Sequence, residues 1–413
     1  MSSLVCPFAA LRPRQETAQA VIAPPYDVVD IEEARALTAD RPESFLHISR
    51  PEIDLPPGTD PFSDEVYARG ARNLRHLIDQ QVLEREATAC YYVYRMVAGS
   101  QSQTGVAFAA SLNAYQSGRI HRHELTRPDK ENDRVRNMEA LNAQTGPVML
   151  TYKANARIDQ LLSAAAMATP TIAAKGRHDV LHSIWRIDDP PRINELTDAL
   201  DALGDLYIAD GHHRSAAAAR VAENRHRNGS EETASHDYFL SVAFPDNQVQ
   251  IFDYNRVVTD LNGLSAGEFI AAVEEVFTLE VTEAQAKPET AATFGMYLDG
   301  RWVRLRLKAT PESDDPVARL DVSLLHQNLL APILGVGDPR VDVRITCVGG
   351  VRGLDELERR VDRQDAAVAF ALFPTGIRDL MAVADAGLLM PPKSTWFEPK
   401  LADGLLTHVL DCV

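Results

Sequence analysis

The stretch LYIADGHHRSAAAAR, residues 206–220, combines three local signals that decide how this part of the chain folds. Residues 206–209 are apolar and β-prone, which predicts a buried strand. The Ala-rich residues 215–220 predict a helix, because alanine has the highest helix propensity. The turn from Asp210 to Arg214 therefore lies at a helix N-terminus. There, unpaired backbone N–H groups and the positive end of the helix dipole favour an anion such as phosphate.

The side chains of this turn are candidate ligand contacts. Gly211 lets the backbone approach a ligand closely, and His212, His213 and Arg214 add side-chain donors. Asp210 would orient a histidine or coordinate Mg²⁺. The alternative is a structural turn in which Asp210 caps the helix and the histidines are solvated. Two histidines and an arginine directly behind a buried strand favour the site.

Composition limits the class of protein. The 413 residues are enough for two or three domains, and 45% hydrophobic with 24% charged residues is typical of a soluble globular protein. A net charge of −17 argues against a general nucleic-acid or anionic-membrane surface. No signal peptide or membrane-length apolar run is evident. Scattered cysteines without a CxxC pair suit a reducing compartment, so the expected location is cytoplasmic.

Near the N-terminus, residues 21–29 read VIAPPYDVV. Pro24 and Pro25 force an extended backbone, and Tyr26 and Asp27 follow directly. Two interpretations stay open: a rigid turn with a structural tyrosine, or a fixed loop that presents Tyr26 and Asp27 to a substrate.

A second group of functional side chains is RIHRHELT, residues 119–126, which follows a predicted hairpin of strands over 89–97 and 104–115. In an extended segment His121 and His123 share one face and could bind a metal, but no third ligand is evident. Glu124 is the more attractive candidate, as a general base or as a ligand for nucleotide-bound Mg²⁺, against the alternative of a solvated carboxylate. His123 and Thr126 are candidate substrate contacts.

The second half of the chain predicts a separate α/β region. Asp299-Gly300 predicts a tight hairpin, and residues 309–316 resemble a linker. We therefore expect a core region over 1–308 and a C-terminal region over 317–413, in which helical and strand patterns alternate. Near its end, MPPKSTWFEPK places basic and hydroxyl side chains in a Pro-bounded loop that either contacts phosphates or simply packs: Lys393, Ser394 and Thr395.

Four motifs in this order, PPYDVV, HELT, IADGHHR and MPPKSTWFEPKL, resemble a prokaryotic family catalogued as domain of unknown function ten-fifteen, over nearly the whole chain. Through its DGHHR strand–turn–helix, that family is similar to the ParB/sulfiredoxin superfamily. This superfamily includes ParB-type nucleotide-binding proteins and free serine kinases, which phosphorylate L-serine with ATP or ADP. The resemblance implies a mixed α/β fold, with a ParB/sulfiredoxin-like phosphate-site core and an additional C-terminal α/β domain.

The resemblance also implies a function. Residues 210–214 would hold the phosphates of ATP or ADP with Mg²⁺, and Glu124 would accept the hydroxyl proton of a small metabolite, with free L-serine favoured. Lys393 would neutralise charge if its loop closes. The family pattern continues DGHHR with Tyr and an acidic residue, whereas Ser215 and Ala216 follow here, which implies altered specificity or activity. The alternatives are a non-catalytic ParB-type nucleotide-binding regulator and a metal-dependent hydrolase or phosphatase using His121, His123 and Asp210.

Overall fold

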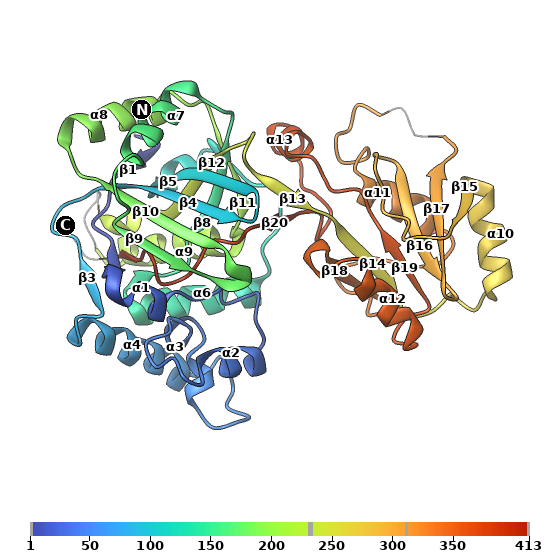
Figure 1. Ribbon diagram of the computed structural model, residues 1–413, viewed down its shortest axis with the longest axis horizontal. Coiled ribbons are helices and arrows are strands. Elements are labelled where there is room, and N and C mark those ends of the chain that lie inside the picture. Colours follow the sequence, from blue (N-terminus) through green and yellow to red (C-terminus); the bar gives the residue numbers. More distant parts are fainter. Residues whose placement is uncertain (1–2, 230–233, 310–312, 411–413) are drawn as a thin grey trace. The chain divides into compact units, whose positions relative to one another are not determined.

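The computed structural model divides into two compact units (Figure 1). The first comprises Met1–Val249 together with Pro399–Val413, and the second comprises Gln250–Glu398. The residues that the structure describes are 3–229, 234–309 and 313–410. Both units combine strands and helices, so the predicted mixed α/β class is confirmed.

The first unit is built on a mixed sheet with the strand order β6-β11-β8-β12-β5-β4-β10-β9, to which β1 adds by pairing with β5. The strands β4 and β5 pair antiparallel, as the predicted hairpin requires. The bounds, in sheet order with β1 last, are Ile120–His121, Leu206–Asp210, Val148–Tyr152, Tyr238–Pro245, Gln101–Ser111, Tyr91–Ala98, Leu181–Ile187, Ile172–Lys175 and Val5–Cys6.

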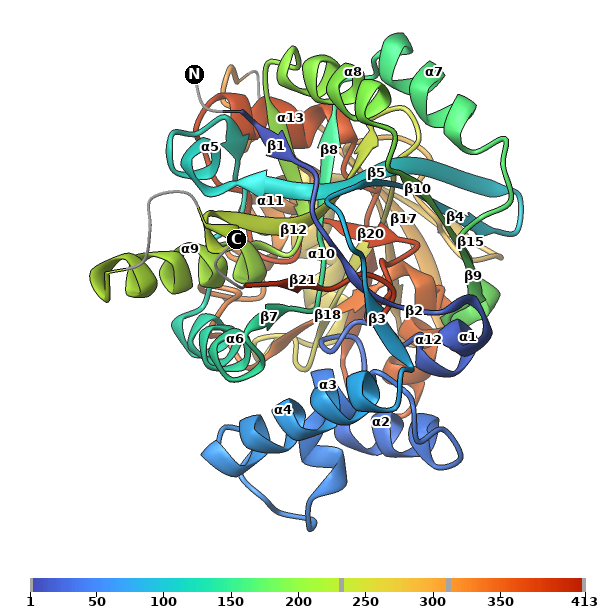
Figure 2. The same cartoon turned by 90° about the vertical axis from the view of Figure 1, so that its left-hand side faces the viewer.

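Helices cover this sheet, and Figure 2 shows α7 beside α8 and α6 beside α9. The Ala-rich helix α9 packs closely because Ala217, Ala218 and Val221 are small and buried in the same core as Leu206 and Ile208 of β11. None of the described helices is long and apolar enough to cross a membrane. The bounds of α1 to α9 are Gln15–Val21, Ile31–Thr38, Leu46–Ser49, Asp64–Asp79, Leu112–Gln116, Pro128–Leu141, Ala156–Ala165, Pro190–Asp201 and His212–Arg227.

The C-terminal residues 399–410 run back through the first unit. Ala23 and Asp403 exchange backbone hydrogen bonds of 3.1 and 3.0 Å. Farther on, β21 (His408–Val409) pairs antiparallel with β7 (Ala143–Gln144). This return places the residues after Pro399 beside the PPYD loop.

Because residues 399–410 run back into the first unit, the division of the chain into two units differs from the predicted one. We expected regions over 1–308 and 317–413, but the first unit ends at Val249 and resumes at Pro399. The residues on either side of the expected linker, which itself includes the undescribed 310–312, belong to the second unit. A Pro-rich polar stretch inside one unit gives the same local signal as a linker between two.

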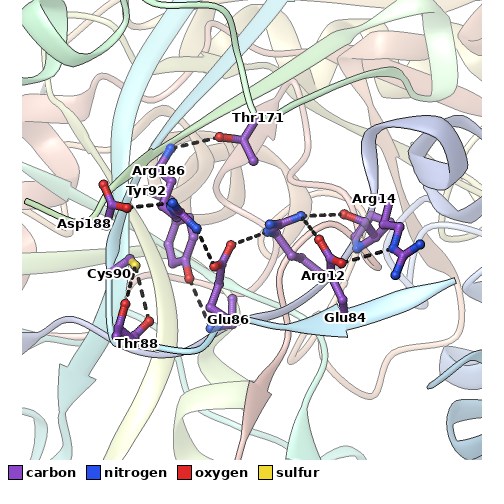
Figure 3. Close-up of polar contacts among 12 residues, drawn as sticks. Arg12, Arg14, Glu84, Glu86, Thr88, Cys90, Tyr92, Thr171, Arg186 and Asp188 are labelled. Atoms are coloured by element: carbon purple, nitrogen blue, oxygen red, sulfur yellow. Dashed lines mark hydrogen bonds and ion pairs between the residues drawn. The ribbon is translucent and has the colours of Figure 1, made fainter. Parts of the chain in front are cut away.

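A charged network ties the N-terminal segment to the sheet (Figure 3). The short strand β2 (Leu11–Pro13) pairs with β3 (Leu83–Arg85). Just after β3, the buried carboxylate of Glu86 accepts hydrogen bonds from Arg12 (2.5 Å) and from Arg186 of β10 (2.8 Å). Each oxygen of this carboxylate has its own guanidinium partner, which offsets the cost of burying its charge.

The second unit is a sheet with the order β15-β17-β16-β19-β14-β18 and a separate pair of β13 and β20. The predicted hairpin at Asp299-Gly300 joins β16 to β17. The predicted alternation of helices and strands after residue 317 is present. The bounds of β13 to β20 are Gln250–Phe252, Tyr254–Val258, Phe277–Thr282, Thr293–Leu298, Arg301–Leu307, Ile345–Gly349, Val368–Ala371 and Trp396–Glu398, and those of α10 to α13 are Ala266–Val276, Asp321–Leu325, Asp355–Asp362 and Ile377–Asp385.

Candidate functional site

The turn between β11 and α9 has the predicted strand–turn–helix form. Gly211 is the N-cap residue of α9 with φ of 104°, a conformation that favours glycine. A Cβ on Gly211 would lie 2.8 Å from Nε and 2.9 Å from an Nη atom of Arg214, so a side chain there would collide with the guanidinium. Glycine is therefore required for Arg214 to fold back over the start of its own helix. Asp210 is not the helix cap, contrary to the structural alternative.

Asp210 lies between two cations. One carboxylate oxygen accepts a 2.6 Å hydrogen bond from Arg214, and the other accepts a 2.9 Å hydrogen bond from Nζ of Lys400. Burial alone would raise the pKa of Asp210, but Lys400 and Arg214 outweigh it and hold that pKa well below its usual range. Because both oxygens are engaged by cations, Asp210 does not fit the predicted role of a Mg²⁺ ligand. Neither does it orient a histidine.

A second carboxylate, Asp403, is buried near the same arginine. A Cβ on Gly146 would lie 3.1 Å from Cδ of Arg214 and 3.4 Å from Oδ1 of Asp403, so the two side chains flank this glycine. Asp403 is 1% exposed, and neither of its oxygens makes a well-formed hydrogen bond within the described part of the chain. Burial raises the pKa of Asp403 to about 7, although Arg214 acts in the opposite direction.

The PPYD loop contributes to this group. The guanidinium of Arg134, from α6, lies 3.8 Å from the ring centroid of Tyr26. Burial raises the pKa of Tyr26 to about 12, and Arg134 partly opposes the shift. Burial lowers the pKa of Arg214, but Asp210, Asp27 and Tyr26 together raise it above its usual value. Tyr26 and Asp27 therefore belong to the electrostatic surroundings of the turn. We call Tyr26, Asp27, Arg134, Asp210, Arg214, Lys400 and Asp403 the charged cluster.

Two of the candidate histidines are buried and uncharged. His212 and His123 are buried and pack edge to face, with ring centroids 4.4 Å apart. Burial, reinforced by His123, lowers the pKa of His212 well below its usual value, and burial lowers the pKa of His123 to about 4. Both rings are therefore neutral near pH 7. His123 is 0% exposed, which contradicts its predicted contact with a substrate.

Glu124 lies beside the turn. Its Oε2 is 4.0 Å from Nδ1 of His212, while Nε2 of His212 accepts a 3.4 Å hydrogen bond from the backbone N–H of His123. That bond assigns the ring proton of neutral His212 to Nδ1, on the side of Glu124. A carboxylate beside an N–H donor in this partly exposed position is a reasonable proton acceptor.

Other predicted residues have different partners. Nε2 of His213 accepts a 3.0 Å hydrogen bond from the backbone of Arg127, and the Thr126 hydroxyl donates to Glu131 (2.8 Å), so both stabilise the start of α6. These contacts argue against phosphate binding by His213 and substrate binding by Thr126. His121 stacks on Tyr207 at 5.0 Å and lies 3.4 Å from Asp205.

The structure does not bring together the three ligands of the metal-dependent hydrolase or phosphatase alternative. His121 faces Asp205, His123 faces His212, and Asp210 faces two cations. Among the described residues, the side chains that gather with metal-ligand spacing are His226, His236 and Asp237, none of which that alternative used.

The predicted phosphate contacts Lys393, Ser394 and Thr395 belong to the second unit. There the Ser394 hydroxyl donates to Pro391 O (2.6 Å), and Nζ of Lys393 lies 5.7 Å from the ring of Tyr254. The lysine that the C-terminal segment brings to the turn is instead Lys400. A separate hollow of about 480 Å³ lies in the first unit between α4 and α6, and no residue of the charged cluster lines it.

Sequence reasoning missed three members of the cluster. They are Lys400, Asp403 and Arg134, which are not among the predicted site residues, although Lys400 ends the stretch MPPKSTWFEPK. A usable signal for Lys400 was its position in the fourth motif, since charged residues inside a Pro-bounded segment seldom serve packing alone.

Comparisons with known proteins identify the family of the chain and several similar solved structures. A family model described as "Protein of unknown function (DUF1015)" matches residues 5–323. No protein with a curated description matches the chain. Similar solved structures include SbnI with a C-terminal truncation from Staphylococcus aureus (12% identity, 73% of this chain and 87% of that chain, TM-score 0.40). They also include free serine kinase in complex with AMP (13%, 75% and 95%, 0.34) and a conserved hypothetical protein from Pyrococcus furiosus (12%, 76% and 98%, 0.34).

Proposed function

The chain belongs to the DUF1015 family, whose description assigns no activity, and we propose its function from the geometry of its charged cluster. We propose that the protein binds a nucleotide, ATP or ADP, and transfers a phosphoryl group to the hydroxyl of a small metabolite, with free L-serine as the favoured acceptor. One observation carries the proposal: two cations, Arg214 and Lys400, converge on Asp210 at the N-terminus of the 16-residue helix α9.

Phosphate binding would use three kinds of donor. The first N–H groups of an α-helix have no partner inside the helix, and they carry the positive end of its dipole. Arg214 offers a planar guanidinium held in place by burial, and Lys400 offers an ammonium held 2.9 Å from Asp210. A phosphate would be a further acceptor for both cations, which now share one carboxylate. Because the rings of His123 and His212 are neutral, we assign the charge of the site to Arg214 and Lys400.

Proton transfer would use Glu124. The acceptor hydroxyl would give its proton to the Glu124 carboxylate, its oxygen would bond to the terminal phosphorus, and the bond from that phosphorus to the bridging oxygen would break, releasing ADP from ATP or AMP from ADP. His212, whose Nδ1 is 4.0 Å from Glu124, would orient the carboxylate. Mg²⁺ would enter with the nucleotide, and no step here passes through a metal at Asp210.

The test is formation of O-phosphoserine by the full-length protein supplied with L-serine, Mg²⁺ and either ATP or ADP, measured by mass spectrometry. In the Glu124→Gln variant we expect kcat to fall about 100-fold or more with an unchanged nucleotide Kd, because positioned general bases contribute about 10²–10⁴-fold. The control is Glu223→Gln, an exposed glutamate of α9. Nucleotide binding without turnover in wild type would replace the kinase by a nucleotide-binding regulator.

Lys400 provides an independent test of the phosphate site. In Lys400→Ala we expect the nucleotide Kd, measured by calorimetry, to rise about ten- to a hundredfold, because a charge-assisted contact contributes about 1.5–3 kcal/mol. The control is Lys175→Ala, an exposed lysine of β9. An unchanged Kd in Lys400→Ala would remove Lys400 from the site and contradict the proposed phosphate position.

A further inference from the structure

A group of three side chains lies near the C-terminal end of α9 and plays no part in the proposed function. His226 is in the last turn of α9, and His236 and Asp237 belong to the 3₁₀ helix Ser235–Asp237 that precedes β12. One ligand atom from each residue, a ring nitrogen or a carboxylate oxygen, lies within 4.8 Å of the other two. A helix of 16 residues with a rise of about 1.5 Å per residue puts this group roughly 20 Å from Arg214.

The three side chains differ in burial in a way that suits ion entry. His236 is 1% exposed, whereas the side chains of His226 and Asp237 are 39% and 23% exposed. The His226 and His236 rings have centroids 5.1 Å apart, and Nε2 of His226 is 2.6 Å from Oδ1 of Asp237. One ligand is therefore fixed in the protein interior, while the other two remain accessible from solvent.

Neighbouring groups hold the 3₁₀ helix in position. The second oxygen of Asp237 accepts a 3.0 Å hydrogen bond from the backbone N–H of Ala234, which leaves Oδ1 directed toward His226. His408 of β21 makes a 2.8 Å hydrogen bond to the carbonyl of Ser235. Carboxylates that bind metals are commonly oriented by a second hydrogen bond of this kind.

The surroundings of the group also suit a cation. Imidazole binds a metal in its neutral form, and the buried ring of His236 has the carboxylate of Asp237 beside it. A cation close to the group, the guanidinium of Arg225, is engaged elsewhere: it donates to Leu410 O (2.5 Å) and Asn142 Oδ1 (2.6 Å).

We propose that His226, His236 and Asp237 bind one divalent transition-metal ion of the zinc class. Two imidazole nitrogens and one carboxylate oxygen are a ligand set that Zn²⁺ accepts, whereas Mg²⁺ and Ca²⁺ prefer all-oxygen ligands. The bound ion would keep one position for water and would fasten the end of α9 to the segment that leads into β12. This site is separate from the proposed phosphoryl transfer.

The test uses the full-length protein after treatment with a chelator. We expect Zn²⁺ to bind with 1:1 stoichiometry in competition with a chromophoric chelator and to raise the unfolding temperature, and we expect Co²⁺ to give visible absorption bands of low coordination number. In His226→Ala the Zn²⁺ Kd should rise at least about tenfold, because loss of a metal-site group commonly costs that much or more. The exposure of His226 makes this variant compatible with folding.

His76→Ala is the matched control, since His76 is also an exposed histidine in the last turn of a helix, α4. It should leave Zn²⁺ binding unchanged, while Asp237→Asn should weaken binding as His226→Ala does. Absence of saturable 1:1 binding in the wild type, or equal Zn²⁺ affinity in wild type and His226→Ala, would overturn the proposal. Neither result depends on whether the protein transfers phosphate.

Discussion

At pH 8 the Asp403→Asn variant is expected to unfold at a higher temperature than the wild type. Burial raises the pKa of Asp403 from 3.8 to about 7, so ionised Asp403 destabilises the folded state. A separation of roughly three pKa units corresponds to at most about 4 kcal/mol. This cost already includes the opposing attraction to Arg214. An asparagine of nearly the same shape removes it but buries an amide in the same place, so we expect a net gain of about 1–3 kcal/mol.

The direction of the Asp403 pKa shift determines how the stability of the protein depends on pH. Because the folded-state pKa is the higher one, the folded protein binds the extra proton between about pH 4 and 7. This contribution to stability is fully present below about pH 4 and is lost as the pH rises through 7. The difference between Asp403→Asn and wild type should therefore shrink as the pH falls from 8 to 5, and it should vanish only below about pH 4, where Asp403 is neutral in the folded and the unfolded state alike.

Thermal unfolding of both proteins from pH 5 to pH 8 measures this difference, with Asp40→Asn as the control at an exposed carboxyl. A variant that is less stable than wild type at pH 8 would mean that Asp403 is an ionised partner of Arg214. The same variant tests function, since a residue that costs stability at a binding site is often retained for the ligand. Loss of substrate binding together with gained stability would place Asp403 in the site.

The strand–turn–helix at residues 206–220 could be predicted from sequence because every signal in it is local. Apolar β-prone residues, a glycine and an Ala-rich run each specify backbone conformation within a few residues. The positive φ of Gly211 agrees with its place in the turn, although its close contact with Arg214 could not be anticipated.

The charged partners of the turn could not be predicted, because they depend on contacts between distant residues. Lys400 is 190 positions from Asp210, and it reaches the turn only because the chain returns to the first unit. The burial of His123 and His212 could not be predicted from the sequence either, since histidine occurs both in cores and on surfaces. The sequence therefore does not show that the rings of these two histidines are neutral and buried.

Arg214→Ala is expected to lower the free energy of unfolding by about 3–5 kcal/mol at pH 8. Helix propensity alone predicts little change, because arginine and alanine are both good helix formers. The structure contradicts that expectation: Arg214 is 6% exposed and pairs with Asp210 at 2.6 Å, and it opposes the raised pKa of Asp403 more strongly than Arg134 does. Removing one partner leaves buried carboxylates poorly compensated, which is the costly case for an ion pair.

The matched control is Arg72→Ala, at an exposed arginine of α4, which should change stability by less than about 0.5 kcal/mol. Nucleotide titration of Arg214→Ala should show a Kd about ten- to a hundredfold higher than wild type. Because the variant is also less stable, its binding is measured well below its unfolding temperature. An unchanged Kd would leave Arg214 a structural residue.

A double-mutant cycle then separates the two roles of Arg214. If its guanidinium compensates the charge of Asp403, truncating Arg214 should cost at least about 1 kcal/mol less in the Asp403→Asn background than in wild type at pH 8. This coupling should disappear at pH 5, where Asp403 is protonated and has no charge to compensate. Additive costs at pH 8 would show that Arg214 serves Asp210 alone. Coupling confined to high pH would show that one arginine balances two carboxylates, so that any phosphate bound there must compete with both.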